Sequence, residues 1–361
     1  MGKRNQVTTR DIAEYAGVSQ STVSMILSGR KNVSFTKETE QKVKDVAAAL
    51  GYVRPRKKAP ALNKSLSGTI LVVCPDVSGG YYQTVLHAIT EEAQSQGCTV
   101  LTALTFRQAA AEETYFNLME ENELFGVISL YPLSRTADAN ALSRRLPVVS
   151  IGEKPEGVRF DSVELDSHKP GVLVADHLAG LGHRKIACIS GPHTKKEKGR
   201  IRRLAGLRQG FADAGIDPDG VVLLTPSAKT WASYPRTEAS SRTGYEMTLK
   251  ALDSGEGFTG LVGHSDDIAY GILAALTDRG LRVPEDMSVA GFDNSPLSAM
   301  PRISLTTVEH AAALKGKRAV ELIMEKHRHR DRTGSHHIIT RMEYEPSLIV
   351  RRTTGPAPKK R

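Results

Sequence analysis

The sequence of 361 residues predicts an α/β protein in which a small all-α head is joined by a hinge to a larger core of parallel, doubly wound sheets. Three helical patterns crowd into residues 8–50, whereas short apolar runs alternate with amphipathic stretches from residue 68 onward. Alternation of strand and helix favours parallel sheets, and about 280 residues suffice for two of them. We therefore expect a core with two lobes.

The positive charge is concentrated in the head. Residues 1–64 carry 13 Lys and Arg and 5 Asp and Glu, a net charge of +8, whereas residues 65–350 have a net charge of −4. A basic module joined to a mildly acidic body is typical of a protein whose head binds a polyanion. A solvated basic arm is the alternative that charge alone leaves open.

The head shows the signals of a helix-turn-helix. Thr9, Ser19 and Thr36 each precede a helical pattern and are the expected N-caps, and Gly17 supplies the tight turn after the first helix. The outer face of the second helix carries short or flexible side chains that can reach base edges or phosphates in a major groove. An ordinary three-helix bundle with a polar surface is the alternative.

The core is expected to contain eight strands and at least five helices. The candidate strands are Thr69–Cys74, Thr99–Ala103, Gly126–Leu130, Val148–Ile151, Lys185–Ser190, Val221–Leu224, Gly260–Val262 and Ser288–Ala290. The candidate helices are Thr84–Gln96, Pro170–Leu181, Arg203–Ala214, Ser240–Leu252 and Ile268–Arg279. Ligands of such sheets bind beyond the carboxyl ends of the strands.

Several segments carry a specific resemblance. Val7-Thr8-Thr9-Arg10-Asp11-Ile12-Ala13-Glu14-Tyr15-Ala16-Gly17-Val18-Ser19-Gln20-Ser21-Thr22-Val23-Ser24 resembles the N-terminal motif of the lac/galactose repressor family of bacterial transcription regulators. Leu178–Ala187, Arg203–Leu207 and Gly280–Asp293 are similar to the effector domain of that family. The resemblance covers nearly the whole chain.

The resemblance implies four parts along the chain. A helix-turn-helix DNA-binding domain covers 1–53 and a hinge covers 54–67. A core like the periplasmic sugar-binding proteins covers 68–350, with an N-lobe at about 68–165 and 297–325 and a C-lobe at about 166–296 and 326–350. The basic tail 351–361 lacks the leucine heptads with which some members form tetramers, so we expect it to be disordered and the protein to be a homodimer.

The resemblance also implies which head residues contact DNA. Thr9, Gln20, Ser21 and Met25 match base-reading positions, and Thr8, Ser19, Thr22, Ser24 and Ser28 match phosphate-contacting positions. The family often has Arg where this chain has Met25, and Met cannot make the bidentate contact of Arg to guanine. We therefore expect Met25 to contact a thymine methyl group.

The hinge has a second implied contact with DNA. In the family this segment forms a short helix on the operator, and an apolar side chain is wedged into the minor groove. Leu62 stands at the wedge position and Ala59 at a neighbouring contact position. Pro60 departs from the family pattern, because proline is tolerated only in the first turn of a helix. The hinge helix is therefore expected to be short or distorted.

Polar and aromatic residues at strand ends and helix starts form the expected effector site. The expected ligand contacts are Ser78, Tyr81, Tyr82, Tyr131, Asp166, Arg203, Ser265, Asp266, Asp293 and His310. Asp and Arg can bind neighbouring sugar hydroxyls, and an aromatic ring can cover the apolar face of a sugar. Arg203 and Asp293 match the ligand positions of the family most closely, whereas Asp266 could serve only as a helix cap.

Other function classes lack support in the sequence. There is no glycine-rich phosphate loop, nucleophile elbow or zinc-binding His-Glu motif, so we expect no enzyme and no cofactor. The basic, His-rich stretch 326–337 is expected to be a solvated loop rather than a metal site. A sugar receptor without a DNA role does not fit the basic head and the lack of an apolar signal segment, so we expect a soluble, cytoplasmic protein.

We expect a repressor with three kinds of partner. These are double-stranded DNA with a pseudopalindromic operator, a second copy of the chain, and a small-molecule effector, for which a sugar inducer is the first expectation. A nucleobase or a phosphoprotein corepressor is the alternative effector.

Overall fold

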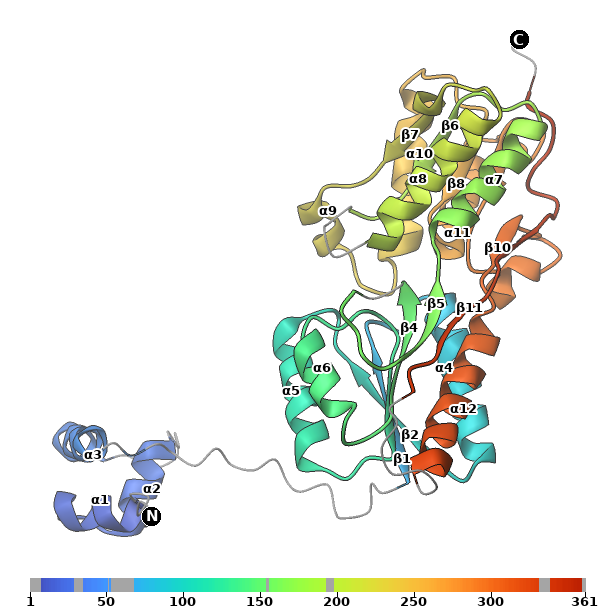
Figure 1. The fold of residues 1–361 in the computed structure, drawn as a ribbon. Helices are drawn as coiled ribbons and strands as arrows, with labels where there is room; N and C mark the ends of the chain where they lie inside the picture. The colour runs from blue at the N-terminus through green and yellow to red at the C-terminus, as the bar shows by residue number, and fades with distance from the viewer. Residues whose placement is uncertain are drawn as a thin grey trace. The chain divides into compact units, whose positions relative to one another are not determined.

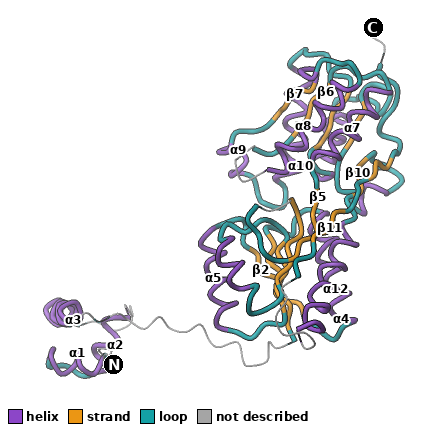
Figure 2. Tube along the Cα trace, viewed as in Figure 1, coloured by secondary structure: helices purple, strands orange, loops and turns teal. Residues whose placement is uncertain are grey.

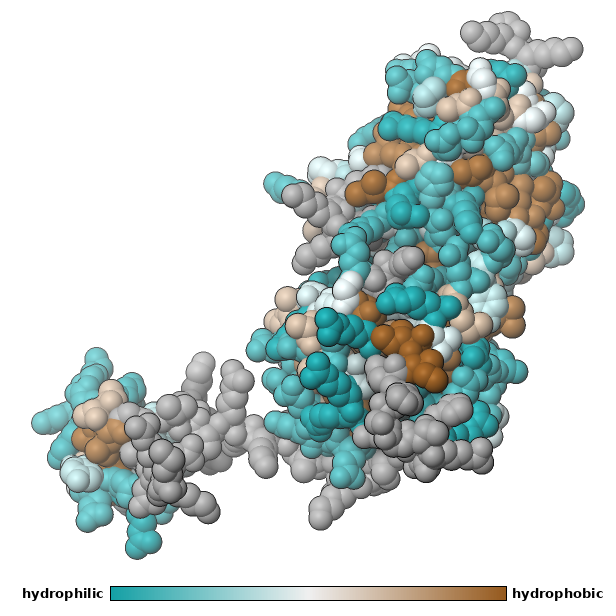
Figure 3. Space-filling model, viewed as in Figure 1, coloured by the Kyte–Doolittle hydropathy of each residue, from teal (hydrophilic) through white to brown (hydrophobic). Residues whose placement is uncertain are grey.

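The computed structural model describes residues 8–28, 35–50, 52, 68–153, 156–192, 198–330 and 338–358. The chain forms two units, a head within residues 1–62 and a core within residues 63–361 (Figure 1). Within the described ranges, no helix combines the length and the apolarity needed to cross a membrane. The visible face of the molecule is mainly hydrophilic, with apolar patches on the lobes of the core (Figure 3).

The head contains the three expected helices, α1 (Thr9–Ala16), α2 (Gln20–Ser28) and α3 (Lys37–Ala49). Gly17 ends α1 with a φ of 65°, a conformation that glycine adopts without a steric penalty. The expectation that Thr9 caps α1 is wrong by one residue. Thr8 is the N-cap, because its side chain accepts from the Asp11 N–H while the Asp11 carboxylate accepts from the Thr8 N–H.

One small apolar core holds these helices together. It contains buried side chains from all three helices, among them Ile12, Ala16, Val23 and Val43. Thr36 caps α3 as expected, since its hydroxyl accepts from the Thr39 N–H.

The N-lobe is built on a six-stranded parallel sheet with the order β11-β5-β4-β3-β1-β2. Its strands are β1 (Thr69–Cys74), β2 (Thr99–Leu104), β3 (Gly126–Ser129), β4 (Val148–Glu153), β5 (Asp161–Leu165) and β11 (Arg341–Glu343). Helices α4 (Gly80–Ser95) and α12 (Ala312–Arg330) cover one face, and α5 (Ala109–Glu121) and α6 (Thr136–Leu142) cover the other (Figure 1).

The C-lobe repeats this design with a four-stranded parallel sheet in the order β7-β6-β8-β9. Its strands are β6 (Ile186–Ile189), β7 (Val221–Leu224), β8 (Gly260–Gly263) and β9 (Ser288–Ala290). Helices α7 (His168–Gly180) and α8 (Lys198–Asp213) pack on one face, and α10 (Ala239–Asp253) and α11 (Asp266–Asp278) pack on the other. Helix α9 (Ala228–Ser233) and two short 3-10 helices, Pro218–Gly220 and Pro296–Ala299, complete it. The two lobes therefore form the expected doubly wound core (Figure 2).

The chain passes between the lobes three times, between β5 and α7, between β10 (Thr307–Glu309) and α12, and between β11 and β12 (Ser347–Ile349). Strands β10 and β12 pair with each other in an antiparallel ribbon. The expected lobe boundaries differ from this arrangement, because Leu305 and Val308 pack in the C-lobe core and β11 adds a strand to the N-lobe sheet. Residues 297–309 therefore belong to the C-lobe, whereas the end of α12 and strand β11 belong to the N-lobe.

The expectation of a disordered tail is wrong for residues 351–358. Thr353 is buried, and its carbonyl accepts from the Val289 N–H of the C-lobe sheet. The Ala357 N–H donates to the Leu181 carbonyl, so the segment closes over the end of α7. The C-lobe supplies hydrogen-bond partners for the backbone of this segment. The absence of leucine heptads says nothing about such backbone contacts, so the sequence argument missed them.

Candidate functional site

A polar surface on the head begins with the caps of α1 and α2. The Ser19 hydroxyl accepts from the Thr22 N–H at 3.1 Å and lies 2.7 Å from the Ser21 hydroxyl. Gln20 links the two helices, because its side-chain amide donates to the Thr9 hydroxyl at 3.1 Å. Local hydrogen bonds therefore fix several of the expected DNA-contacting side chains before any ligand is present.

The exposure of these side chains suits a contact surface. Thr8, Ser19, Gln20, Ser21 and Ser24 are exposed, whereas Thr9, Thr22 and Met25 are half-buried. Ser28 is the last residue of α2. The hinge residues Ala59 and Leu62 lie outside the described residues.

A cavity of about 750 Å³ lies between the lobes, at the carboxyl ends of their strands. This volume is in the range of small-molecule sites, which is roughly 300–1,000 Å³. Eight of the ten expected effector contacts line it, namely Ser78, Tyr81, Tyr82, Tyr131, Arg203, Ser265, Asp293 and His310. The structure thus brings these eight residues together around one cavity.

Asp166 and Asp266 do not line the cavity, which corrects those two expectations. Asp166 accepts from Arg202 at 2.6 Å and from the His168 N–H at 2.9 Å, so its carboxylate stabilises the crossing into α7. Burial acts to raise the pKa of Asp166, but the hydrogen bonds and positive charge of its partners together outweigh burial, so the pKa is lowered.

Asp266 is a buried structural carboxylate. It accepts from the Thr307 hydroxyl at 2.5 Å and from the Ser295 N–H at 2.8 Å. Burial raises its pKa to about 6. Its neighbour Asp267 lines the cavity instead, and Ser265 is the residue that caps α11.

Arg203 is the most deeply placed cation of the cavity. Only 6% of its surface is exposed, its guanidinium carbon lies 4.3 Å from the centre of the Phe292 ring, and it donates to the His264 carbonyl. Burial lowers the pKa of Arg203, whereas the neighbouring Asp293 opposes that change. A buried guanidinium held on an aromatic face is well placed to bind hydroxyls or a carboxylate of a ligand.

Asp293 and His310 complete this end of the cavity. Asp293 has a φ of 120°, a strained conformation for a residue with a side chain, and such strain is common at ligand sites. Burial raises the pKa of Asp293 well above its ordinary value, and burial lowers the pKa of His310. His310 is therefore a neutral imidazole at neutral pH.

Several buried polar atoms on cavity-lining residues have no hydrogen-bond partner within the described part of the chain. They include Tyr81 Oη, Ser150 Oγ, Arg203 Nε and His310 Nδ1. Leaving a buried polar group without a partner costs roughly 1–3 kcal/mol. A ligand rich in hydroxyl groups would provide the missing partners.

Tyr131 is rigidly held at the opposite wall. Its hydroxyl donates to Glu112 at 2.7 Å and lies 2.7 Å from the Thr105 hydroxyl. Burial raises the pKa of Tyr131, so its ring is a neutral, fixed surface. Such a ring can cover the apolar face of a sugar or a base.

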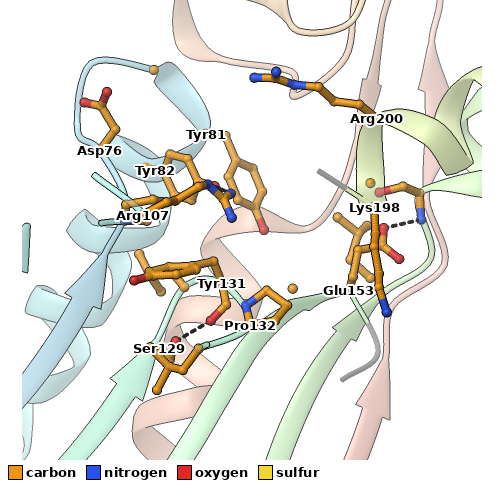
Figure 4. Close-up of a pocket in the computed structure, with 18 of the residues that line it drawn as sticks. Asp76, Tyr81, Tyr82, Arg107, Ser129, Tyr131, Pro132, Glu153, Lys198 and Arg200 are labelled. Atoms are coloured by element: carbon orange, nitrogen blue, oxygen red, sulfur yellow. Dashed lines mark hydrogen bonds between the residues drawn. The ribbon is translucent and has the colours of Figure 1, made fainter. Parts of the chain in front are cut away.

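The sequence did not identify several charged residues of the cavity. Arg107, Glu153, Arg200, Arg236 and Asp267 line it, and so does the aromatic Trp231 of α9. Figure 4 shows Tyr81, Tyr82, Arg107 and Tyr131 gathered on one side, with Arg200 and Lys198 facing them. Arg107 follows β2 and Glu153 ends β4, so the strand-end rule could have located these two.

The basic, His-rich stretch is partly helical rather than a loop. Helix α12 continues through Arg330, and His327 stacks on Phe125 with ring centres 3.8 Å apart. Across the described residues there is no group of three or more side chains suited to hold a metal ion.

Comparisons with known proteins agree with this architecture. Residues 8–55 match the model of the bacterial regulatory proteins of the lacI family, and residues 175–354 match a periplasmic binding protein-like domain. The HTH-type transcriptional regulator DegA of Bacillus subtilis is 31% identical over 97% of this chain and 99% of its own length.

Two solved structures share the fold. The lac repressor dimer bound to operator and the anti-inducer ONPF is 25% identical, with a TM-score of 0.64, over 97% of this chain and 100% of that one. A complex of the transcriptional regulator CelR with cellobiose is 23% identical, with a TM-score of 0.63, over 96% of this chain and 100% of that one. The head, the two-lobed core and the match over the full length together show that the chain belongs to the lacI family of bacterial transcriptional regulators, which are not enzymes.

Proposed function

We propose that this regulator is a dimeric repressor that holds a pseudopalindromic operator with two heads and releases it when a sugar enters the interlobe cavity. The proposal rests mainly on the buried polar atoms of Tyr81, Ser150, Arg203 and His310. These atoms have no hydrogen-bond partner among the described residues, and all four residues line one cavity. Aromatic walls next to such atoms are suited to a polyol ring.

The switch follows from the way the lobes are joined. Three chain segments cross between them, and the effector cavity lies at the same place. A ligand that contacts both lobes changes the relative free energies of their arrangements only if it binds one arrangement more tightly. An inducer must therefore favour the arrangement in which the two heads do not reach both half-sites.

In the proposed DNA contact, Gln20 and Ser21 read base edges, and the hydroxyls of Thr8, Ser19 and Thr22 contact phosphates. Ser24 and Ser28 add phosphate contacts, Thr9 and Met25 add base contacts, and Ala59 and Leu62 bind the minor groove. The basic charge of the head makes the affinity fall steeply with salt.

The experiment is selection of binding sites from a pool of random DNA duplexes by the full-length protein. The proposal predicts enrichment of an inverted repeat, with an affinity that falls at least tenfold between about 50 and 200 mM salt. Gln20→Ala is expected to weaken binding about 10- to 100-fold at one base pair per half-site. Gln41→Ala on the exposed face of α3 is the matched control.

Absence of any enriched repeat, or equal losses for Gln20→Ala and Gln41→Ala, would overturn the proposed DNA contact. Sedimentation of the complex with the enriched duplex tests the dimer, since two chains per duplex are expected.

A further inference from the structure

Two serines interrupt the apolar interior of the N-lobe sheet. Ser129 of β3 is 1% exposed and Ser150 of β4 is 7% exposed. Buried parallel strands are otherwise nearly continuous runs of large apolar side chains. Because side chains alternate along a strand, Ser129 lies on the same face as Val127, and Ser150 lies on the same face as Val148. Both valines belong to the core that α5 and α6 cover.

The interlobe cavity extends along this face of the sheet. We define a side chamber by six small or apolar residues that line this part of the cavity: Ser129, Leu133, Ala139, Ser150, Val158 and Phe160. Ala139 comes from α6, and Val158 and Phe160 precede β5. The short side chains of the two serines and Ala139 leave space that larger residues would fill in a closed core.

The side chamber contains one hydroxyl that lacks a partner. Ser150 Oγ makes no hydrogen bond within the described part of the chain, although the residue is buried. The Ser129 hydroxyl differs, because it donates to the Tyr131 carbonyl at 2.5 Å (Figure 4). A buried hydroxyl without a partner destabilises the fold, so a ligand atom that accepts a hydrogen bond from it gains affinity.

Gly152 lies between the side chamber and the cleft. It follows Ser150 by two residues, on the same face and closer to the carboxyl end of β4, where the cleft begins. Its φ of 143° is a conformation that favours glycine. A side-chain carbon at this position would have the Leu130 carbonyl and Tyr131 Cα as its nearest neighbours, both 3.9 Å away. The position is therefore open, and a ligand group can pass beside Tyr131 into the side chamber.

We infer that the effector is an acylated sugar whose acyl group enters the side chamber and accepts a hydrogen bond from Ser150. An acyl group combines a carbonyl oxygen for this hydroxyl with alkyl carbon for the apolar walls at Val158 and Phe160. The sugar ring would remain at the buried end of the cleft, at Arg203 and His310. The inference rests on the proposed function, because it specifies the chemical class of the ligand of the same cavity.

The test is calorimetric titration of the full-length protein with matched sets of sugars. Each set contains a parent hexose, its 2-acetamido-2-deoxy derivative, its 6-O-acetyl ester and its ethyl glycoside, with glucose, galactose and mannose as parents. One buried methyl group raises affinity about fourfold and one hydrogen bond about fivefold. We therefore expect one acetylated sugar to bind at least about tenfold more tightly than its parent and than the ethyl glycoside, which lacks the carbonyl. The preferred derivative distinguishes an amide from an ester.

Two variants of Ser150 separate the hydrogen bond from the space. Ser150→Ala is expected to weaken binding of the acetylated sugar about fivefold, and Ser150→Val, which fills the chamber, at least about tenfold. Both are expected to leave the weaker binding of the parent sugar unchanged. Ser143→Ala is the matched control, because Ser143 is a buried serine of the N-lobe that does not line the cavity.

The ligand-free variants give an independent readout of the unpaired hydroxyl. Ser150→Ala removes a buried polar atom that has no partner, so its melting temperature is expected to rise. Ser143→Ala is expected to lower the melting temperature, because the Ser143 hydroxyl donates to the Asn140 carbonyl at 2.9 Å.

Five outcomes decide between the claims. A preference for an acetylated sugar that is lost in Ser150→Val and kept in Ser143→Ala supports the inference. A parent sugar or an ethyl glycoside that binds as tightly as the acetylated sugars overturns the inference but leaves the proposed function intact. An acetyl preference that Ser150→Val retains also overturns it, because the acyl group then lies elsewhere in the cavity. Failure of every sugar to bind overturns both. An acetylated sugar that binds in the chamber without changing the affinity for the selected operator supports the inference and overturns the proposed switch.

Discussion

Arg203 and His310 come from distant segments and meet at the buried end of the cavity, where Arg203 Nη2 lies 3.4 Å from His310 Nε2. A guanidinium can only donate, so Nε2 accepts and the single proton of the neutral ring is on Nδ1. Nδ1 lacks a hydrogen-bond partner in the described part of the chain. Arg203 therefore fixes the tautomer of His310 in which Nδ1 carries the proton.

The first prediction concerns this donor. The side-chain amide of Asn can place an N–H near the position of Nδ1, whereas that of Gln reaches the position of Nε2. His310→Asn is expected to keep more affinity for the effector than His310→Gln, and His310→Ala is expected to lose about 10- to 100-fold. Calorimetric titration measures all three, and a better rescue by Gln than by Asn would contradict the assigned tautomer.

The second prediction concerns a contact between the lobes. Asp267 of α11 in the C-lobe accepts from the Gly80 N–H at the start of α4 in the N-lobe, where the cap residue Gly79 offers no side chain. A carboxylate at a helix N-terminus contributes about 0.5–2 kcal/mol. Asp267→Ala is expected to weaken effector binding by about 2- to 30-fold, because it destabilises the arrangement that encloses the cavity.

Asp278→Ala, at the other end of α11, is the control. Its carboxylate accepts from Tyr245 within the C-lobe at 2.9 Å and does not reach the N-lobe. Equal loss of effector affinity in the two variants would show that Asp267 acts only through the stability of α11.

The third prediction concerns pH. Lys315 is fully buried in α12, its ammonium has no hydrogen-bond partner within the described ranges, and burial lowers its pKa from 10.5 to about 8. The charged groups that face it are Glu309 of β10, Glu153 of β4, Arg203 of α8 and Glu343 of β11. The unfolded chain holds the proton of this lysine more tightly than the folded chain does.

Because the unfolded state binds more protons above pH 8, the free energy of unfolding contributed by Lys315 rises from about pH 8 toward 10.5. Below pH 8 the buried ammonium costs about 3 kcal/mol. Lys315→Met is expected to raise the free energy of unfolding at pH 7 and to flatten its rise between pH 8 and 9.5. Urea unfolding at several pH values measures both, and an unchanged slope would contradict the assignment.

The buried framework of this fold could be predicted from the sequence, and much of the ligand site could not. Apolar runs such as Thr69–Cys74 predict buried strands, and residues such as Ser19 predict helix caps. Both predictions depend on interactions between residues close in the sequence, and the folded structure keeps these interactions. Asp266 and Asp267 show the limit, because consecutive residues of a helix point about 100° apart and only the packing of α11 decides which one faces the ligand. The sequence analysis expected Asp266 in the ligand site, whereas Asp267 is the one that lines the cavity.

Arg107, Arg200 and Arg236 of the cavity were missed for a different reason. Phe106 and Arg107 both have positive φ values, 49° and 55°, in a turn without the glycine that would signal it. Arg200 and Arg236 come from segments whose direction depends on contacts with Trp231 and Phe106, far away in the sequence. Long-range contacts of this kind leave no local pattern.

The fourth prediction concerns Met25. Met25 is half-buried on α2, beside the exposed Ser24. Met can contact a thymine methyl group, and Arg would instead bind O6 and N7 of guanine. Met25→Arg is expected to change the preferred base at one position of each half-site, with a discrimination of about 1–3 kcal/mol. Repeating the selection with the variant measures this, and an unchanged half-site would exclude a base contact at Met25.

The most direct test of the account is a titration of the selected operator by the full-length protein with and without the sugar that binds most tightly. The account predicts that saturating sugar lowers operator affinity at least about tenfold, the ordinary size of a coupling between two sites. By reciprocity, operator must lower the affinity for the sugar by the same factor. Operator affinity that stays constant while the sugar saturates the cavity would contradict the claim that this cavity controls the head.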